Sequence, residues 1–215
     1  MPEGLTSSLI RPRLRGVADI FAAAAALPAA ALLVERARPG GPTLAAAAYA
    51  AGLCILLVGS ALYHRQGWPL RVALRLRQID HANIYVMIAG STTPLAHALI
   101  PGPGATLIAV MWAIAALGVL KTLLWPRAPR QLSTALYVVM GVVPIPVLGD
   151  LGRAVGDDNL TWLIAGGVLY GLGALVYARR WPNPDPFTFG YHEIFHVFVF
   201  AAALLHFVVI WRVVT

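Results

Sequence analysis

Seven long apolar stretches constrain this chain more than any other feature of its sequence. They cover residues 16–34, 44–64, 79–100, 105–124, 132–149, 159–178 and 191–211. A transmembrane helix needs about 20 mostly apolar residues, and a membrane barrel would instead show short alternating strands. Only 12% of the residues are charged, about half the fraction typical of soluble domains. The sequence therefore predicts an all-α polytopic membrane protein: one domain over residues 1–215 with seven transmembrane helices.

The distribution of positive charge predicts how these helices are oriented. Twelve of the sixteen Lys and Arg residues fall in one set of alternate loops: Arg11, Arg13, Arg15, Arg65, Arg71, Arg75, Arg77, Lys121, Arg127, Arg130, Arg179 and Arg180. The other set holds Arg36, Arg38, Arg153 and Arg212. Since cytoplasmic loops are enriched in Lys and Arg, we expect a cytoplasmic N-terminus and an outside C-terminus in the plasma (inner) membrane. Arginines scattered over short loops do not indicate a nucleic-acid partner.

Ionisable side chains stand at the ends of three predicted spans. His64 closes the span 44–64, Asp80 opens the span 79–100, and His192 opens the span 191–211. In the predicted topology all three lie on the cytoplasmic side at similar depth. Ionisable groups in lipid are costly, and by default they indicate a functional site.

The spacing of these residues predicts a zinc site with one open position. His192 and His196 are four residues apart and share one face of a helix, so both imidazoles can bind one ion. His64 offers a third nitrogen, and Ser60 a hydroxyl one turn before it. Catalytic zinc keeps three protein ligands and a water, which a nearby carboxylate can hold or deprotonate. We assign Asp80 to that water, with direct ligation left open.

Other polar residues in these stretches have weaker assignments. Residues 192–196 also match the HExxH pattern, in which the glutamate is a general base, so Glu193 is a secondary candidate. An arginine partner for Glu193 is an equally good interpretation. We expect His97 to be interfacial, His206 to be structural or proton-handling, and His81 to face elsewhere or to cap its helix. Pro94, Pro144 and Pro146 lie inside spans, where proline is expected to kink the helix.

Four segments of the chain resemble the hemolysin III family, the bacterial branch of the progestin and adipoQ receptors. They are Gly59–His64, Asp80–Tyr85, Ile88–Pro94 and His192–Phe198. The resemblance implies seven helices, an inside N-terminus, and zinc held by His64, His192 and His196. It also implies that Asp80 contacts the zinc-bound water, that Ser60 is an accessory residue, and that the chain is related to membrane hydrolases such as alkaline ceramidases. The segment before the first span has only about 15 residues, so we do not expect hormone reception through a long N-terminal domain.

Several functions follow from these assignments. The first is a zinc-dependent hydrolase of a lipid amide or ester, ceramide-like in chemistry, in which Asp80 steers water and Ser60 or a backbone donor stabilises the oxyanion. The alternative is a non-enzymatic protein that senses or regulates the state of the membrane, with zinc in a structural role. The sequence does not define an oligomeric state. Direct cytolysis, the activity for which the family is named, is disfavoured because the sequence shows no amphipathic insertion hairpin. A transporter is disfavoured because the number of spans is odd and the acidic site is not at the midplane.

Overall fold

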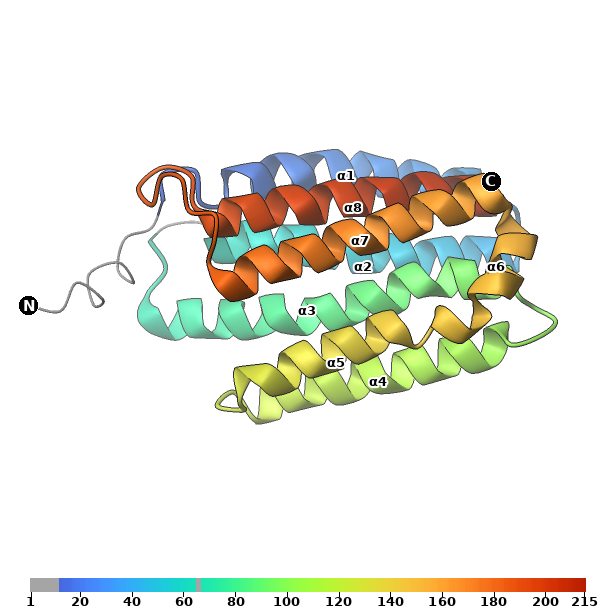
Figure 1. The fold of residues 1–215 in the computed structure, drawn as a ribbon, viewed down its shortest axis with the longest axis horizontal. Coiled ribbons are helices and arrows are strands. Elements are labelled where there is room, and N and C mark those ends of the chain that lie inside the picture. The colour runs from blue at the N-terminus through green and yellow to red at the C-terminus, as the bar shows by residue number, and fades with distance from the viewer. Residues whose placement is uncertain (1–11, 65–66) are drawn as a thin grey trace, which may run out of the picture.

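The described part of the chain is entirely helical in its regular elements, which confirms the all-α part of the prediction. A computed structural model describes residues 12–64 and 67–215, except for the side chains at positions 130 and 131. Its helices run along the long axis of one elongated bundle (Figure 1). They are α1 (Val17–Arg36), α2 (Gly41–His64), α3 (Leu70–His97), α4 (Gly104–Leu124), α5 (Arg130–Val142), the 3₁₀ turn η1 (Ile145–Val147), α6 (Leu148–Val155), α7 (Asp157–Arg179) and α8 (Tyr191–Val214).

Six of the helical segments are long and apolar enough to cross a membrane. They are α1, α2, α4, the broken segment Leu132–Val155, α7 and α8. Helix α3 has 28 residues, but charged residues near its start and hydroxyl residues near its end interrupt its apolar sequence. The six segments support a polytopic helical membrane protein.

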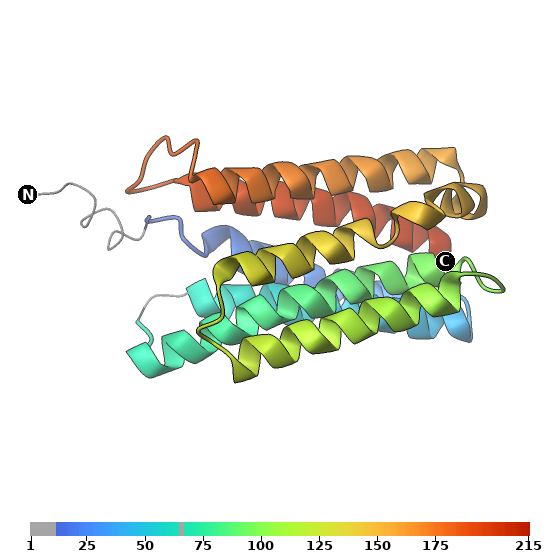
Figure 2. The same ribbon diagram turned by 60° about the horizontal axis from the view of Figure 1, so that its bottom comes forward.

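The fifth predicted span is interrupted at its prolines, as the sequence indicates. Helix α5 ends at Val142, and the chain passes through Pro144 and η1 before α6 begins (Figure 2). Proline lacks the N–H that would continue the helix, and its ring clashes with the preceding turn. Pro94 lies close to the end of α3, which terminates at His97.

Small residues allow the central helices to approach closely. A Cβ on Gly90 of α3 would lie 3.0 Å from the carbonyl oxygen of Ala48 in α2, and one on Gly52 of α2 would lie 3.3 Å from the Cα of Met87. Helices in a membrane commonly pack through such close backbone contacts. Lipid tails are as apolar as the side chains, so van der Waals packing and not burial from water holds the helices together. The outer face of the bundle instead consists of large apolar side chains, such as Phe21 and Leu124.

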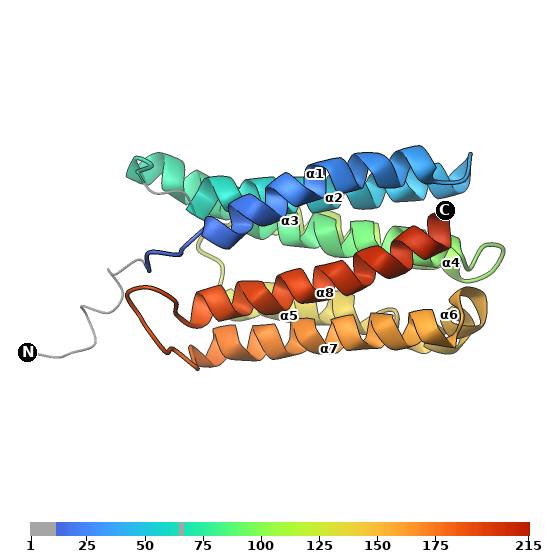
Figure 3. The same cartoon turned by 90° about the horizontal axis from the view of Figure 1, so that it is seen from above.

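The alternation of helix direction brings distant parts of the chain to the same end of the bundle. The starts of α1, α3, α5 and α8 lie there with the ends of α2, α4 and α7 (Figures 1 and 3). We call this the histidine end, because His64 terminates α2 and His192 is the second residue of α8. The C-terminus of α8 and the short helix α6 lie at the opposite end.

Candidate metal centre

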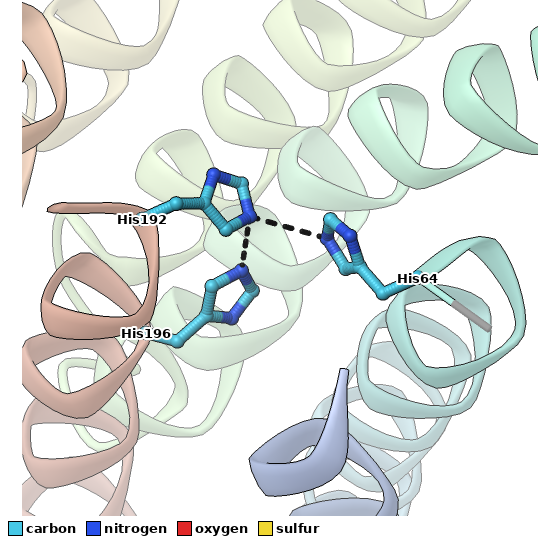
Figure 4. Close-up of side chains that lie close together, drawn as sticks. All are labelled: His64, His192 and His196. Carbon is cyan, nitrogen blue, oxygen red and sulfur yellow. Dashed lines mark hydrogen bonds between the residues drawn. The ribbon is translucent and has the colours of Figure 1, made fainter. Parts of the chain in front are cut away.

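Three histidines from two helices converge at the histidine end, as the sequence predicts. The Nε2 atom of His192 lies 3.4 Å from that of His64 and 2.9 Å from that of His196 (Figure 4). The candidate ligand atoms of the three residues all lie within 4.8 Å of one another. His64 is 6% exposed and His196 9% exposed, so the cluster is shielded from bulk solvent. These three side chains could hold one metal ion.

The donor set fits zinc. Imidazole nitrogen is a good zinc ligand, with Zn–N distances of about 2.0–2.1 Å, which places neighbouring nitrogens of a tetrahedral site about 3.3 Å apart. The observed separations of 2.9 and 3.4 Å lie close to that value. Each neutral imidazole presents one lone pair, so three converging nitrogens are suited to a single cation. With three protein ligands, a tetrahedral ion keeps one position for water or substrate.

A buried carboxylate that the sequence analysis did not single out supports this cluster. Asp19 of α1 is 2% exposed, and its Oδ1 lies 3.0 Å from Nδ1 of His196. Metal-binding histidines usually donate their second N–H to such a carboxylate, which fixes the tautomer and orients the ring. With the proton on Nδ1, the Nε2 lone pair of His196 faces the other two histidines. Asp19 therefore belongs to the site as a positioning residue.

The sequence does contain a signal for Asp19. It is the only charged residue in the predicted span 16–34, and an intramembrane ionisable residue is a functional candidate by default. It also lies on the buried face of α1, in register with Ala23, Ala26 and Ala30. Those neighbours are apolar, so Asp19 can only be satisfied by polar groups from other helices.

The two predicted catalytic residues lie beside this carboxylate. The Ser60 hydroxyl donates to Asp19 Oδ1 over 2.8 Å, and both side chains are buried. The Asp80 side chain is 13% exposed, and its Oδ2 lies 3.7 Å from Nδ1 of His81. Its carboxylate is near enough to Asp19, Ser60 and His196 for electrostatic interaction. The water-holding role of Asp80 and the accessory role of Ser60 stay predictions.

Glu193 has an arginine partner, which is one of the two roles predicted for it from the sequence; the other is a general base. One carboxylate oxygen pairs with the Arg15 guanidinium, and the other accepts the backbone N–H of Gly190 over 2.8 Å. The second contact is half of a capping box at the start of α8. Both oxygens are therefore engaged, and Glu193 anchors the helix that presents His192 and His196.

The loop before α8 holds the chain entering α1 against the histidine end. The N–H groups of Arg13 and Leu14 donate to the carbonyls of Phe187 and Thr188, over 2.8 and 3.2 Å. Within this loop, hydrogen bonds from the Phe187 N–H and from Thr188 hold the pKa of Asp185 below its usual value. The loop stabilises the start of α1, and with it the position of Asp19.

A cavity of about 230 Å³ adjoins the histidines between the starts of α1 and α8. Asp19, His192 and His196 contribute to its wall. The remaining lining is mostly apolar and includes Leu14, Val17, Phe21, Phe189 and Val197. The side chains of Phe21 and Val197 are largely exposed on the outside of the bundle. An apolar molecule in the membrane could therefore approach the histidines between these two helices.

Gly16 makes a close contact that provides a test of how His64 is positioned. Its φ is 80°, and a Cβ there would lie 2.8 Å from the Cβ of His64. We expect Gly16→Ala to lower both the thermal unfolding midpoint and the metal affinity, because the left-handed conformation costs about 1–2 kcal/mol and His64 must move. Gly40→Ala is the matched control, with a φ of 93° and no atom within 4 Å. It should lower the midpoint alone; an equal loss of metal affinity in both variants would contradict the role given to this contact.

Comparisons with known proteins give matches that cover more than half of the chain. A family model described as Haemolysin-III related matches residues 7–207. Hemolysin-3 of Bacillus cereus is 31% identical over 192 residues, which cover 87% of this chain and 84% of that protein. The human monocyte to macrophage differentiation factor is 29% identical, with 76% of this chain and 68% of that protein covered. The rice Heptahelical transmembrane protein ADIPOR2 is 32% identical over 66% of this chain and 71% of its own length.

Proposed function

The chain belongs to the haemolysin III family, within the progestin and adipoQ receptor superfamily, and we propose that this multi-pass membrane protein is a zinc-dependent hydrolase of a lipid amide or ester. The observation that carries the proposal is the convergence of His64, His192 and His196 beside a buried carboxylate and an apolar cavity. A substrate with one polar carbonyl group and long apolar chains, ceramide-like in chemistry, suits such a site.

The proposed topology has seven spanning helices, including α3, with the N-terminus in the cytoplasm and the C-terminus outside the plasma membrane. By the bounds of the helices, ten Lys and Arg residues of the described ranges fall in or beside the helix termini of the histidine end, against four at the opposite end. Arg11 and Arg65, which the sequence also assigns to the cytoplasmic side, lie outside the described residues. Because positive charge is enriched in cytoplasmic loops, the proposed site lies at the cytoplasmic leaflet.

In the proposed mechanism His64, His192 and His196 hold the metal, and the carboxylates manage protons and orientation. Zinc, when bound, supplies a Lewis acid that polarises a carbonyl and lowers the pKa of water. Asp19 keeps the proton of His196 on Nδ1, and Asp80 accepts a proton from the attacking water. Ser60, as an accessory residue, donates to Asp19 and helps to hold that carboxylate in place. The apolar wall formed by residues of α1 and α8 excludes bulk water from the reacting bond.

The proposal is tested by incubating purified protein in nanodiscs with a panel of ceramides, acyl amides and lipid esters, and by measuring released fatty acid by mass spectrometry. We expect release by the wild type and a loss of about 100-fold or more in Asp80→Asn, the usual range for a general base. Zinc content should be unchanged in that variant. Asp150→Asn, an exposed residue at the opposite end, serves as the control. Zinc-loaded wild type that releases nothing across the panel would contradict the hydrolase assignment.

A second candidate function is a sensor or regulator of the membrane with structural zinc. It is favoured by the way the polar network links three helices, since Asp19 of α1 contacts Ser60 of α2 and His196 of α8. A metal at their meeting point would fix the relative positions of these helices. Under this alternative, Asp80→Asn keeps both zinc and the full biological effect of the protein.

A further inference from the structure

A second cavity lies at the end of the bundle opposite to the histidines. Its volume is about 380 Å³, within the range of small-ligand pockets. Four parts of the fold meet there: the link between α1 and α2, the end of α3, the junction of α6 and α7, and the end of α8 (Figure 1). Its polar lining residues are Arg38, Asn159 and Arg212. The proposed hydrolase chemistry uses none of them.

Two guanidinium groups in this cavity have no acidic partner within the part of the chain that the structure describes. Among the described residues, no carboxylate oxygen comes within 4.0 Å of Arg38 or Arg212. By contrast Arg153, at the same end of the bundle, pairs with Asp150. The cavity therefore has an excess of positive charge.

Each arginine is held in place by contacts that leave further N–H donors available. Arg38 donates through Nε to the Val214 carbonyl over 3.3 Å and through Nη2 to the Val213 carbonyl. Arg212 donates through Nη1 to the Asn159 side chain over 3.2 Å and lies 5.6 Å from the centre of the Trp162 ring. A guanidinium has five N–H donors, so both groups keep donors for a ligand.

The local helix ends do not account for both charges. The C-terminus of a helix carries a partial negative charge, which explains why Arg38 donates to the last carbonyls of α8. Arg212 instead makes its side-chain hydrogen bond to Asn159, in the first turn of α7. The acidic residues of that turn, Asp157 and Asp158, are not part of the cavity lining. An anion between Arg38 and Arg212 would balance the remaining charge.

We propose that this cavity binds a phosphate group between Arg38 and Arg212. Arginine is suited to phosphate because its planar N–H donors can contact two oxygens at once. The cavity lies at a helix end, the depth at which phospholipid headgroups meet a membrane protein. Trp162 of the same end is 40% exposed, as expected for an interfacial aromatic residue. The phosphate belongs either to an anionic phospholipid headgroup or to a soluble phosphate.

The test uses the purified full-length chain in a neutral detergent and measures the thermal unfolding midpoint. The additions are phosphatidylglycerol, phosphatidylcholine, or inorganic phosphate at constant ionic strength. We expect the unfolding midpoint to increase by about 5 °C or more when the free ligand concentration is about 100 times the Kd. The double variant Arg38→Gln, Arg212→Gln should lose this increase. Arg153→Gln, which removes a paired arginine at the same end, should keep it.

The additions distinguish the source of the phosphate. An increase with phosphatidylglycerol and not with inorganic phosphate identifies a lipid headgroup, whereas an increase with inorganic phosphate identifies a soluble anion. If the double variant does not fold, native mass spectrometry of Arg212→Gln replaces it, with fewer retained phosphatidylglycerol molecules expected than in the wild type. Equal responses of the wild type and the double variant to every addition would overturn the proposal.

Discussion

Purified wild-type protein is expected to contain about one zinc ion per chain, and His192→Ala is expected to lose it. Nε2 of His192 lies within 3.4 Å of Nε2 in both other histidines, so its removal takes away the central member of the cluster. Loss of an outer-shell partner alone typically costs about 10–100-fold in metal affinity, so we expect loss of a direct ligand to exceed about 100-fold. Elemental analysis after size-exclusion chromatography measures the ratio.

The matched control for this experiment is His97→Ala. His97 is also a helical histidine, but it ends α3 at the opposite end of the bundle, beside Gly41. The His97→Ala variant should keep the same number of zinc ions per chain as the wild type. Zinc retained by His192→Ala, or lost equally from both variants, would show that the metal is not held by the histidine cluster.

The second large effect is expected from Asp19→Asn. The substitution keeps the size of the side chain but removes the charge that holds the N–H of His196, so we expect metal affinity to fall by about 10–100-fold. Competition with a chromophoric chelator measures the dissociation constant. Ser60→Ala removes only a hydroxyl that donates to Asp19, and its effect should be smaller and in the same direction.

A structural role alone for Asp19 predicts a different result. In that case Asp19→Asn would lower the unfolding midpoint of metal-free protein and leave the zinc dissociation constant unchanged. The control is Asp150→Asn, an exposed carboxylate paired with Arg153 at the opposite end. It should change neither the midpoint of the metal-free protein nor the dissociation constant by a measurable amount.

The predictable part of the site is the part that helix periodicity and span direction define. His192 and His196 share a helix face because they are four residues apart. His64 lies near them because α2 ends, and α8 begins, at the same end of the bundle. The broken helix after Val142 was predictable for the same local reason, since prolines at 144 and 146 remove backbone donors.

The rest of the site depends on contacts that spacing does not encode. Glu193 matches a catalytic motif, yet it caps α8 and pairs with Arg15, a residue 178 positions away. Asp19 is the only charged residue of the predicted span 16–34, and its contact with His196 depends on the rotation of α1 about its axis. Arg38 and Arg212 come from different helix ends, and only the packed bundle brings them to one cavity.

The sequence alone determined that the chain is an all-helical membrane protein, that the three histidines lie at one end of the bundle, and that His192 pairs with His196. These follow from length, hydropathy and the 3.6-residue turn, which are local properties of the chain. The tertiary structure decided which polar groups of different helices meet: Asp19 with His196, Glu193 with Arg15, and Arg38 near Arg212. Those contacts depend on how each helix is rotated and how closely small residues let the backbones approach, and no single segment carries that information.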